Sequence, residues 1–274
     1  MNKSLELFDM TGQTVVITGG GGVLAGVMAE TLIGAGAVVS IWGRGRSAPV
    51  DTIVTKLREK TGCSSGQVHG VKVDTGDKES VAKALEETVE KAGSPSVLVN
   101  GVGGNIGKSS FIDADLDTFR KILDMNILAG LVIPTQVFAE YWMKNESEGT
   151  IINLASMASY IPLSGVWAYD AAKAAVMNLT MATAKEFAPH NIRVNAIAPG
   201  FFIGYQNKDL LIADEEKGTL TQRGQDIINH TPYGRFGEQS DLAGTTLYLA
   251  SRKASGFVSG VTIPVDGGYL IHNV

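Results

Sequence analysis

The sequence predicts an α/β protein: a single-domain, Rossmann-like, doubly wound parallel sheet of about seven strands with helices on both faces. Short apolar runs rich in β-branched residues recur along the chain, segments of helical length separate them, and a glycine cluster directly follows the first run. Continuous apolar strands are typical of parallel sheets that are buried on both faces. No linker, repeat or low-complexity tract divides the 274 residues, so we expect one domain over residues 1–274.

The strands are expected where the apolar runs occur. In chain order these are 14–18, 37–42, 67–73, 96–100, 150–155, 192–198 and 261–265. Helices are expected between them: from the glycine cluster to about residue 34, and at 77–92, 115–145 and 169–187. Segment 201–233 is polar and too long for an ordinary loop, so it is predicted to be a substrate lid.

The composition excludes several functional classes. The net charge of −5 gives no basic face for nucleic acid or an anionic membrane. Cys63 is the single cysteine, which excludes an internal disulfide and fits a reducing compartment. We see no secretion signal, and no segment approaches the roughly 18 apolar residues of a membrane span. We therefore expect a cytoplasmic protein without a metal site.

The glycine cluster at residues 19–22 indicates a dinucleotide site. It lies between a strand and a helix, where glycine lets the backbone approach a pyrophosphate and the helix N-terminus attracts negative charge. The alternative is a flexible turn without a ligand. The cofactor contacts expected here are Gly19, Gly21, Gly22, Val23 and Leu24.

The end of the second strand bears on the choice of cofactor. An NAD site usually has a carboxylate here, whereas an NADP site uses arginine for the 2′-phosphate. This chain has Arg44 and Arg46 and no acid, so we predict NADP(H), with NAD(H) as the alternative. Asp74, at the end of the third strand, is expected either to accept a hydrogen bond from the adenine or to cap a helix.

Tyr169 and Lys173 are candidates for acid/base chemistry. They are four residues apart in a predicted helix and therefore share a face. An ammonium group and a positive nicotinamide would favour the phenolate and lower the pKa of the tyrosine. Ser156, just after the fifth strand, can hydrogen-bond a substrate oxygen. By itself, Tyr-x-x-x-Lys is a common accidental pair.

The chain resembles the short-chain dehydrogenases/reductases over nearly its full length. Ser156 and Tyr169 are thirteen residues apart, as in that family, and the family's other motifs occur in its order. The matching features are the turn at residues 18–25, Asp74, Asn100-Gly101-Val102-Gly103, Asn126, Ser156, Tyr169 with Lys173, Arg193-Val194-Asn195, Pro199-Gly200 and Asp266-Gly267-Gly268.

The resemblance implies a role for each matching residue. Tyr169 would be the general acid/base, Lys173 would hold the nicotinamide ribose and lower the pKa of Tyr169, and Ser156 would orient the carbonyl. Asn126 would hold a water that links Lys173 to solvent, or would be a structural residue at a helix kink. The further cofactor contacts implied are Asp74, Thr75, Asn100, Gly101, Tyr169, Lys173, Pro199, Gly200 and Phe202.

Four features depart from the family pattern, one of them the turn Asn-Gly-Val-Gly-Gly-Asn at 100–105, where Asn-Asn-Ala-Gly is common. Val23 and Ala25 replace the later glycines of the turn, and Gly204 stands where a threonine often binds the cofactor. The turn at 100–105 and the segment 199–207 instead resemble the subgroup of D-mannonate oxidoreductases, also called fructuronate reductases. This resemblance implies a sugar-acid substrate, D-mannonate or D-fructuronate.

Polar residues in these segments are the candidate substrate contacts, although each fits a solvated lid surface equally well. Neutral groups suit a polyol, and cations suit a carboxylate. The candidates for contacts with polyol hydroxyls are Asn105, Gln206, Asn207 and His230. The candidates for binding a carboxylate are Lys108, Lys208 and Arg223. The alternatives are reduction of another polyol, a ketone or a 3-oxoacyl thioester, and a non-catalytic dinucleotide-sensing protein. The family also implies a homotetramer formed through the helices at 115–145 and 166–188.

Overall fold

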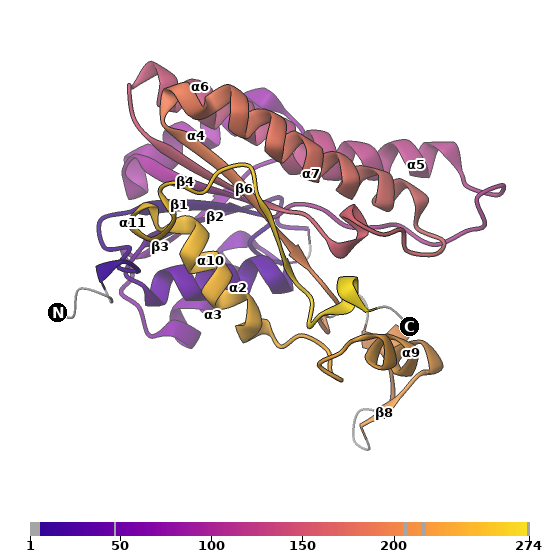
Figure 1. Cartoon of the computed structure of the whole chain (residues 1–274). Coiled ribbons are helices and arrows are strands. Elements are labelled where there is room, and N and C mark those ends of the chain that lie inside the picture. Colours follow the sequence, from indigo (N-terminus) through magenta and orange to yellow (C-terminus); the bar gives the residue numbers. More distant parts are fainter. Residues whose placement is uncertain (1–5, 47, 205–207, 215–217, 273–274) are drawn as a thin grey trace.

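Seven parallel strands form the central sheet of the computed structural model, which describes residues 6–46, 48–204, 208–214 and 218–272 (Figure 1). The strand order is β3-β2-β1-β4-β5-β6-β9. The bounds are β1 Thr14–Thr18, β2 Val38–Gly43, β3 Val68–Lys72, β4 Pro95–Asn100, β5 Gly149–Leu154, β6 Ile192–Pro199 and β9 Thr262–Val265. The order reverses between β1 and β4, and ligands of such sheets bind beside the carboxyl ends at that point.

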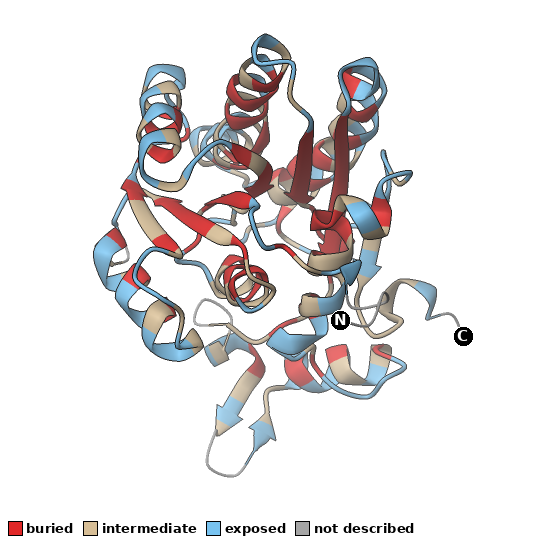
Figure 2. Cartoon of the chain, turned by 90° about the vertical axis from the view of Figure 1, so that its left-hand side faces the viewer, coloured by how far each residue is buried: buried red, intermediate tan, exposed pale blue. Residues whose placement is uncertain are grey.

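Helices cover both faces of the sheet because the strands are apolar on both. Val15 and Ile17 of β1 point to one apolar cluster and Val16 points to the other. The first cluster is covered by α2 (Val23–Gly34), α3 (Val50–Thr61) and α10 (Ala243–Ala250), the second by α4 (Lys78–Ala92), α6 (Ile133–Lys144) and α7 (Trp167–Phe187). Figure 2 shows the strands buried between these layers. The predicted fold is confirmed.

The predicted strand bounds are close to the observed ones. β1 has the predicted bounds, and the other strands differ by one residue at one or both ends. Around β3 the ladder continues past the strand, because Gln67 O accepts from Val39 N and Val73 N donates to Gly43 O. The helix predicted from residue 169 begins earlier, at Trp167.

The long helix predicted at 115–145 is interrupted by a π-helix. It consists of α5 (Leu116–Leu123), the π-helical η1 (Asp124–Val132) and α6. Within η1, a Cβ at Gly130 would lie 2.6 Å from Val102 O, so only glycine allows this turn to approach the loop after β4. π-Helical turns frequently occur at functional sites.

The stretch Leu116–Lys144 is long and apolar enough, by length and composition, to cross a membrane. The expectation that no segment approaches such a composition is therefore wrong. Half of its most apolar window is buried in the protein. Phe138 and Trp142 of α6 stack with each other, and Phe138 also packs on Trp42 of β2, with ring centroids 5.5 Å apart in each pair. The apolar composition thus serves the core.

The predicted lid segment contains its own small elements below the sheet in Figure 1. These are α8 (Lys208–Leu211), β7 (Ile212–Asp214), β8 (Thr219–Leu220) and α9 (Gln222–His230). Leu211, Ile227 and Phe236 form an apolar cluster of their own beneath them. The remaining elements are η2 (Met157–Ser159), η3 (Ala188–His190), η4 (Gln239–Leu242), α11 (Arg252–Ser255) and η5 (Tyr269–Ile271).

The Arg193-Val194-Asn195 motif is structural. Arg193 donates to Leu249 O and Val258 O, and Asn195 donates to Val258 O and accepts from Val261 N. These bonds tie the C-terminal segment to β6.

Candidate active site

The register of the sheet brings the motif residues to one edge. Thr18 of β1 pairs with Asn100 of β4, which pairs with Asn153 of β5. Because these strands are parallel and end at the same level, the glycine turn, the turn after β4 and the segment leading to Ser156 lie on the same side.

Glycine is required where the first two turns meet. Gly19 has φ +65°, and a Cβ there would lie 2.9 Å from Gly101 O. A Cβ on Gly101 would collide with Thr18 O and would lie 3.0 Å from the methyl of Ala25. Ala25, which replaces a family glycine, therefore packs where Gly101 leaves room. Thr18, which the sequence analysis did not select, accepts from Gly101 N through Oγ1 at 3.1 Å and so joins the two turns.

The N-terminus of α2 fits a pyrophosphate. Its N-cap is Gly22, and no side chain caps the helix. Gly21 and Gly22 are exposed, while Val23 and Leu24 are partly buried in the first turn. Backbone N–H groups at such an end attract an anion through hydrogen bonding and the helix dipole.

The residues expected near the adenosine lie after β2 and β3. Arg44 and Arg46 are exposed, and no ion pair involves either within the described residues. Asp74 is exposed and accepts from Gly76 N at 3.1 Å, while Asp77 caps α4. Asp74 is therefore not the cap of α4. Thr75 is buried.

The side chain of Asn100 is buried, with 2% of the residue exposed. Its amide donates to Asn153 Oδ1 at 2.9 Å and to Thr135 Oγ1 at 3.1 Å. Asn153 in turn donates to Thr180 of α7. This polar chain joins β4, β5 and the helix that carries Tyr169.

Ser156, Tyr169 and Lys173 meet at the carboxyl end of β5. Ser156 is the N-cap of η2, accepts from Ala158 N at 3.1 Å and hydrogen-bonds the phenol of Tyr169. The ammonium of Lys173 lies 5.6 Å from the centre of the tyrosine ring and donates to Leu154 O at 2.7 Å. The three predicted residues therefore form one group.

The pKa of Tyr169 is raised in the protein alone, and the lowering expected from an ammonium together with a positive nicotinamide stays a prediction. Burial raises it most, the hydrogen bond with Ser156 lowers it, and the charge of Asp170 raises it. Burial also lowers the pKa of Lys173 to about 8. Desolvation is therefore the largest influence on the pKa of each of the two groups.

Asn126 is 1% exposed and holds the loop after β4. Its Nδ2 donates to Gly104 O and to Ile122 O, each at 2.8 Å, and its Oδ1 accepts from Gly104 N at 3.0 Å. The bond to Ile122 O lies at the start of the π-helix, which fits the structural alternative for this residue. The water-holding role that the family resemblance implies stays a prediction, and Oδ1 has room for a second donor.

The turn after β6 lies beside the end of β9. Gly200 N donates to Val265 O, and a Cβ on Gly200 would lie 2.7 Å from Asp266 Cα. Pro199 and Phe202 are buried, and Phe202 pairs with Gly237 in an isolated bridge. Gly204 is partly buried at the end of this described stretch.

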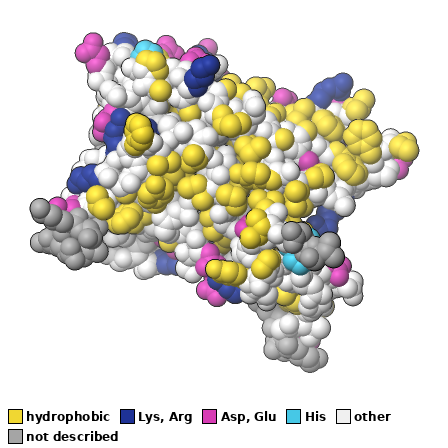
Figure 3. All heavy atoms as spheres, in the orientation of Figure 1, with side chains coloured by type: hydrophobic (Ala, Val, Ile, Leu, Met, Phe, Trp, Pro, Cys, Tyr) yellow, Lys and Arg dark blue, Asp and Glu magenta, His cyan; other side chains and the backbone are white. Residues whose placement is uncertain are grey.

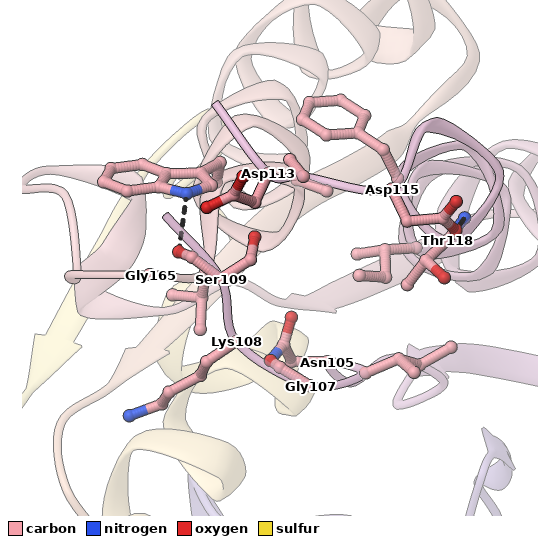
Figure 4. A pocket seen from close by; sticks show the side chains of 15 residues that line it. Asn105, Gly107, Lys108, Ser109, Asp113, Asp115, Thr118 and Gly165 are labelled. Atoms are coloured by element: carbon pink, nitrogen blue, oxygen red, sulfur yellow. Dashed lines mark hydrogen bonds between the residues drawn. The ribbon is translucent and has the colours of Figure 1, made fainter. Parts of the chain in front are cut away.

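The candidate substrate residues are divided among different places. Asn105 is exposed, donates to Gly107 O and lines a cavity of about 270 Å³ with Lys108, Ser109 and Trp167 (Figure 4). Arg223 of α9 faces Tyr269, whose pKa it lowers against the larger effect of burial. Gln206 and Asn207 lie outside the described residues.

The two other lid candidates, His230 and Lys208, lie on α9 and α8. His230 stacks on Tyr269 and His272, with ring centroids 4.5 and 4.4 Å away, and Lys208 opens α8. The contacts of Ser109 and Trp167 were not anticipated, because nothing in their local pattern marks them.

A model of the enoyl-(acyl carrier protein) reductase family matches residues 22–270. The uncharacterized oxidoreductase UxuB of Bacillus subtilis is 41% identical, with 97% of each chain covered. The 2-dehydro-3-deoxy-D-gluconate 5-dehydrogenase of Dickeya dadantii is 35% identical, with 97% of this chain and 98% of the relative covered.

Among solved structures, a putative D-mannonate oxidoreductase from Haemophilus influenza with bound NAD has a TM-score of 0.86 and 33% identity, with 97% of each chain covered. Likeness over nearly the whole length accompanies the serine, tyrosine and lysine already located. The protein is therefore a member of the short-chain dehydrogenase/reductase family, whose enzymes are oxidoreductases dependent on NAD(H) or NADP(H).

Proposed function

We propose that the enzyme transfers a hydride between NADP(H) or NAD(H) and a sugar acid, with D-mannonate and D-fructuronate as the substrate pair. The observation that carries this proposal is the group of Ser156, Tyr169 and Lys173 beside an uncapped helix N-terminus. The names of the Dickeya and Haemophilus proteins support a sugar acid.

In the reducing direction, Tyr169 donates its phenolic proton to the substrate carbonyl oxygen, and Ser156 donates a hydrogen bond to the same oxygen. In the oxidising direction, Tyr169 takes the proton back from the alcohol. The dinucleotide, when bound, supplies or accepts the hydride and in its oxidised form adds a positive charge near the phenol. Lys173 holds the nicotinamide ribose and, as an ammonium, favours the phenolate.

The glycine turn and the N-terminus of α2 would hold the cofactor, with backbone contacts from residues 19–24 and from Asn100 and Gly101. Asp74 and Thr75 would hold the adenine, while Pro199, Gly200 and Phe202 would hold the carboxamide side. We place NADP(H) first because Arg44 is exposed without an acidic partner, although the Haemophilus relative holds NAD.

Asn105 and Lys108 give the cavity a neutral hydrogen-bonding group and a cation, which suit a hydroxylated acid. Reduction of another polyol or ketone is the alternative. A non-catalytic dinucleotide sensor would have no need to retain both Tyr169 and Lys173.

We also propose a cytoplasmic homotetramer with segment 201–233 as its lid. Leu128 of η1 and Met181 of α7 are exposed apolar residues on the two helices predicted to pack against copies of themselves. Figure 3 shows apolar side chains gathered on the face that includes α7. Sedimentation of the purified protein tests the tetramer.

A panel of sugar acids, neutral polyols, simple ketones and an acetoacetyl thioester, each assayed with both cofactors by nicotinamide absorbance, tests the function. We expect the highest kcat/KM with D-fructuronate or D-mannonate. A higher value for the thioester or for a neutral ketone would refute the sugar-acid assignment.

A further inference from the structure

The loop from Gly103 to Ser109 connects two parts of the catalytic group. At its start, a Cβ on Gly103 would lie 2.7 Å from Asn126 Oδ1 and 3.2 Å from Lys173 Nζ. At its end, Ser109 N donates to Gly165 O at 3.2 Å, and Ser109 O accepts from Trp167 Nε1 at 3.1 Å. Trp167 begins the helix that carries Tyr169, so the loop borders the catalytic residues at both ends.

Lys108 lies in this loop. Its aliphatic stem packs against Gly165, and its ammonium forms no ion pair with any described residue. An added Cβ at Gly165 would lie 3.6 Å from Lys108 Cβ and 3.9 Å from its Cδ, so the aliphatic stem packs along the glycine. Gly165 has φ +80°, which favours glycine at this contact. No ion pair involves the ammonium of Lys108 within the described chain.

Asp113 and Asp115, the two acids that line the same cavity, hydrogen-bond to other groups. Asp113 accepts from Ser110 Oγ at 2.6 Å, and Asp115 caps α5 by accepting from Thr118 N at 2.7 Å. Figure 4 shows the ammonium of Lys108 pointing away from Asp113 and Asp115. These carboxylates therefore do not neutralise it.

Two other cations are placed differently. Arg223, on α9 of the lid segment, lowers the pKa of Tyr269, and Arg235 forms a two-point ion pair with Asp241 at 2.7 and 3.1 Å. Lys108 differs because it lies next to residues that contact Tyr169's helix and Lys173.

We propose that Lys108 binds the carboxylate of the substrate and so distinguishes sugar acids from uncharged polyols. The inference rests on the proposed function, because it requires an anionic substrate. An exposed carboxylate contact is reversible and adds binding without taking part in proton transfer, so Lys108 is a specificity residue and not an acid or base. Asn105 lines the same cavity, and its Oδ1 is the group left to accept from a substrate hydroxyl, since its amide nitrogen already bonds Gly107 O.

The test compares a sugar acid with the compound in which CH₂OH replaces the carboxylate, such as D-fructuronate with D-fructose. Both are assayed with the wild type, Lys108→Gln, Lys108→Arg and the control Lys121→Gln, an exposed lysine of α5. A charge-assisted hydrogen bond is worth roughly 10- to 100-fold in affinity. We expect Lys108→Gln to raise KM for the acid by that factor with kcat within about threefold, and to leave the uncharged compound and the cofactor KM unchanged.

Rescue by Lys108→Arg and wild-type behaviour of Lys121→Gln would support a local carboxylate contact. Equal KM changes for the acid and the uncharged compound, or no change for the acid, would overturn the role of Lys108 while leaving the proposed function intact. A wild-type enzyme that turns over no sugar acid in the panel would instead refute the proposed function, and the inference with it.

Discussion

Replacing Lys173 by methionine should remove a pH-dependent contribution to stability. Lys173 is 5% exposed, and burial lowers its pKa from 10.5 to about 8. At pH values below about 8, where Lys173 is charged in the folded protein, burying its ammonium lowers the free energy of unfolding by roughly 3 kcal/mol. Because the folded pKa is the lower one, the unfolded state binds more protons between the two values, and stability rises with pH in that window.

Between about pH 7 and pH 9.5 this one group should add about 2 kcal/mol to the free energy of unfolding of the dinucleotide-free wild type. Lys173→Met keeps a long apolar stem but has no proton to lose, so it should lack this rise. It also loses the bond to Leu154 O, worth about 1 kcal/mol at either pH. Urea unfolding of both proteins at both pH values gives the comparison. Parallel pH dependences would refute the assignment of a depressed pKa to Lys173.

Three further predictions concern activity. Tyr169→Phe should lower kcat by roughly 10²- to 10⁴-fold, while titration of the cofactor shows nearly unchanged affinity; activity above a few per cent would remove Tyr169 from its role. Arg44→Asp should shift the ratio of kcat/KM for NADP and NAD towards NAD, because it removes the cation placed for a 2′-phosphate; an unchanged ratio would contradict the arginine argument. Asp170→Asn removes a negative charge that raises the pKa of Tyr169, although less than burial does. The acidic limb of kcat/KM for alcohol oxidation should therefore move to lower pH. A limb that stays in place or moves upward would exclude this effect.

Much of the fold and the catalytic group could be predicted locally. β1 has the predicted bounds, and the spacing of Tyr169 and Lys173 on one helix follows from helical geometry alone. The π-helix at residues 124–132 could not be predicted, because it depends on contacts of Asn126 and Gly130 with a loop more than twenty residues earlier in the chain.

The same limit applies to individual site residues. Asn100 carries a family motif, but the register of β4 and β5 turns its side chain towards Asn153 inside the protein. The sequence predicts that Asp74 contacts the adenine or caps a helix, and the geometry of the turn shows that Asp77, not Asp74, caps α4.

The sequence by itself determined the parallel α/β architecture, the family and the identity of Ser156, Tyr169 and Lys173, because strand and helix periodicity and motif spacing are properties of neighbouring residues. The tertiary structure alone decided how strongly the phenol and the ammonium are desolvated and which cation near them lacks an acidic partner. Desolvation and charge pairing depend on atoms brought together from distant segments, and no local pattern of residues encodes those distances.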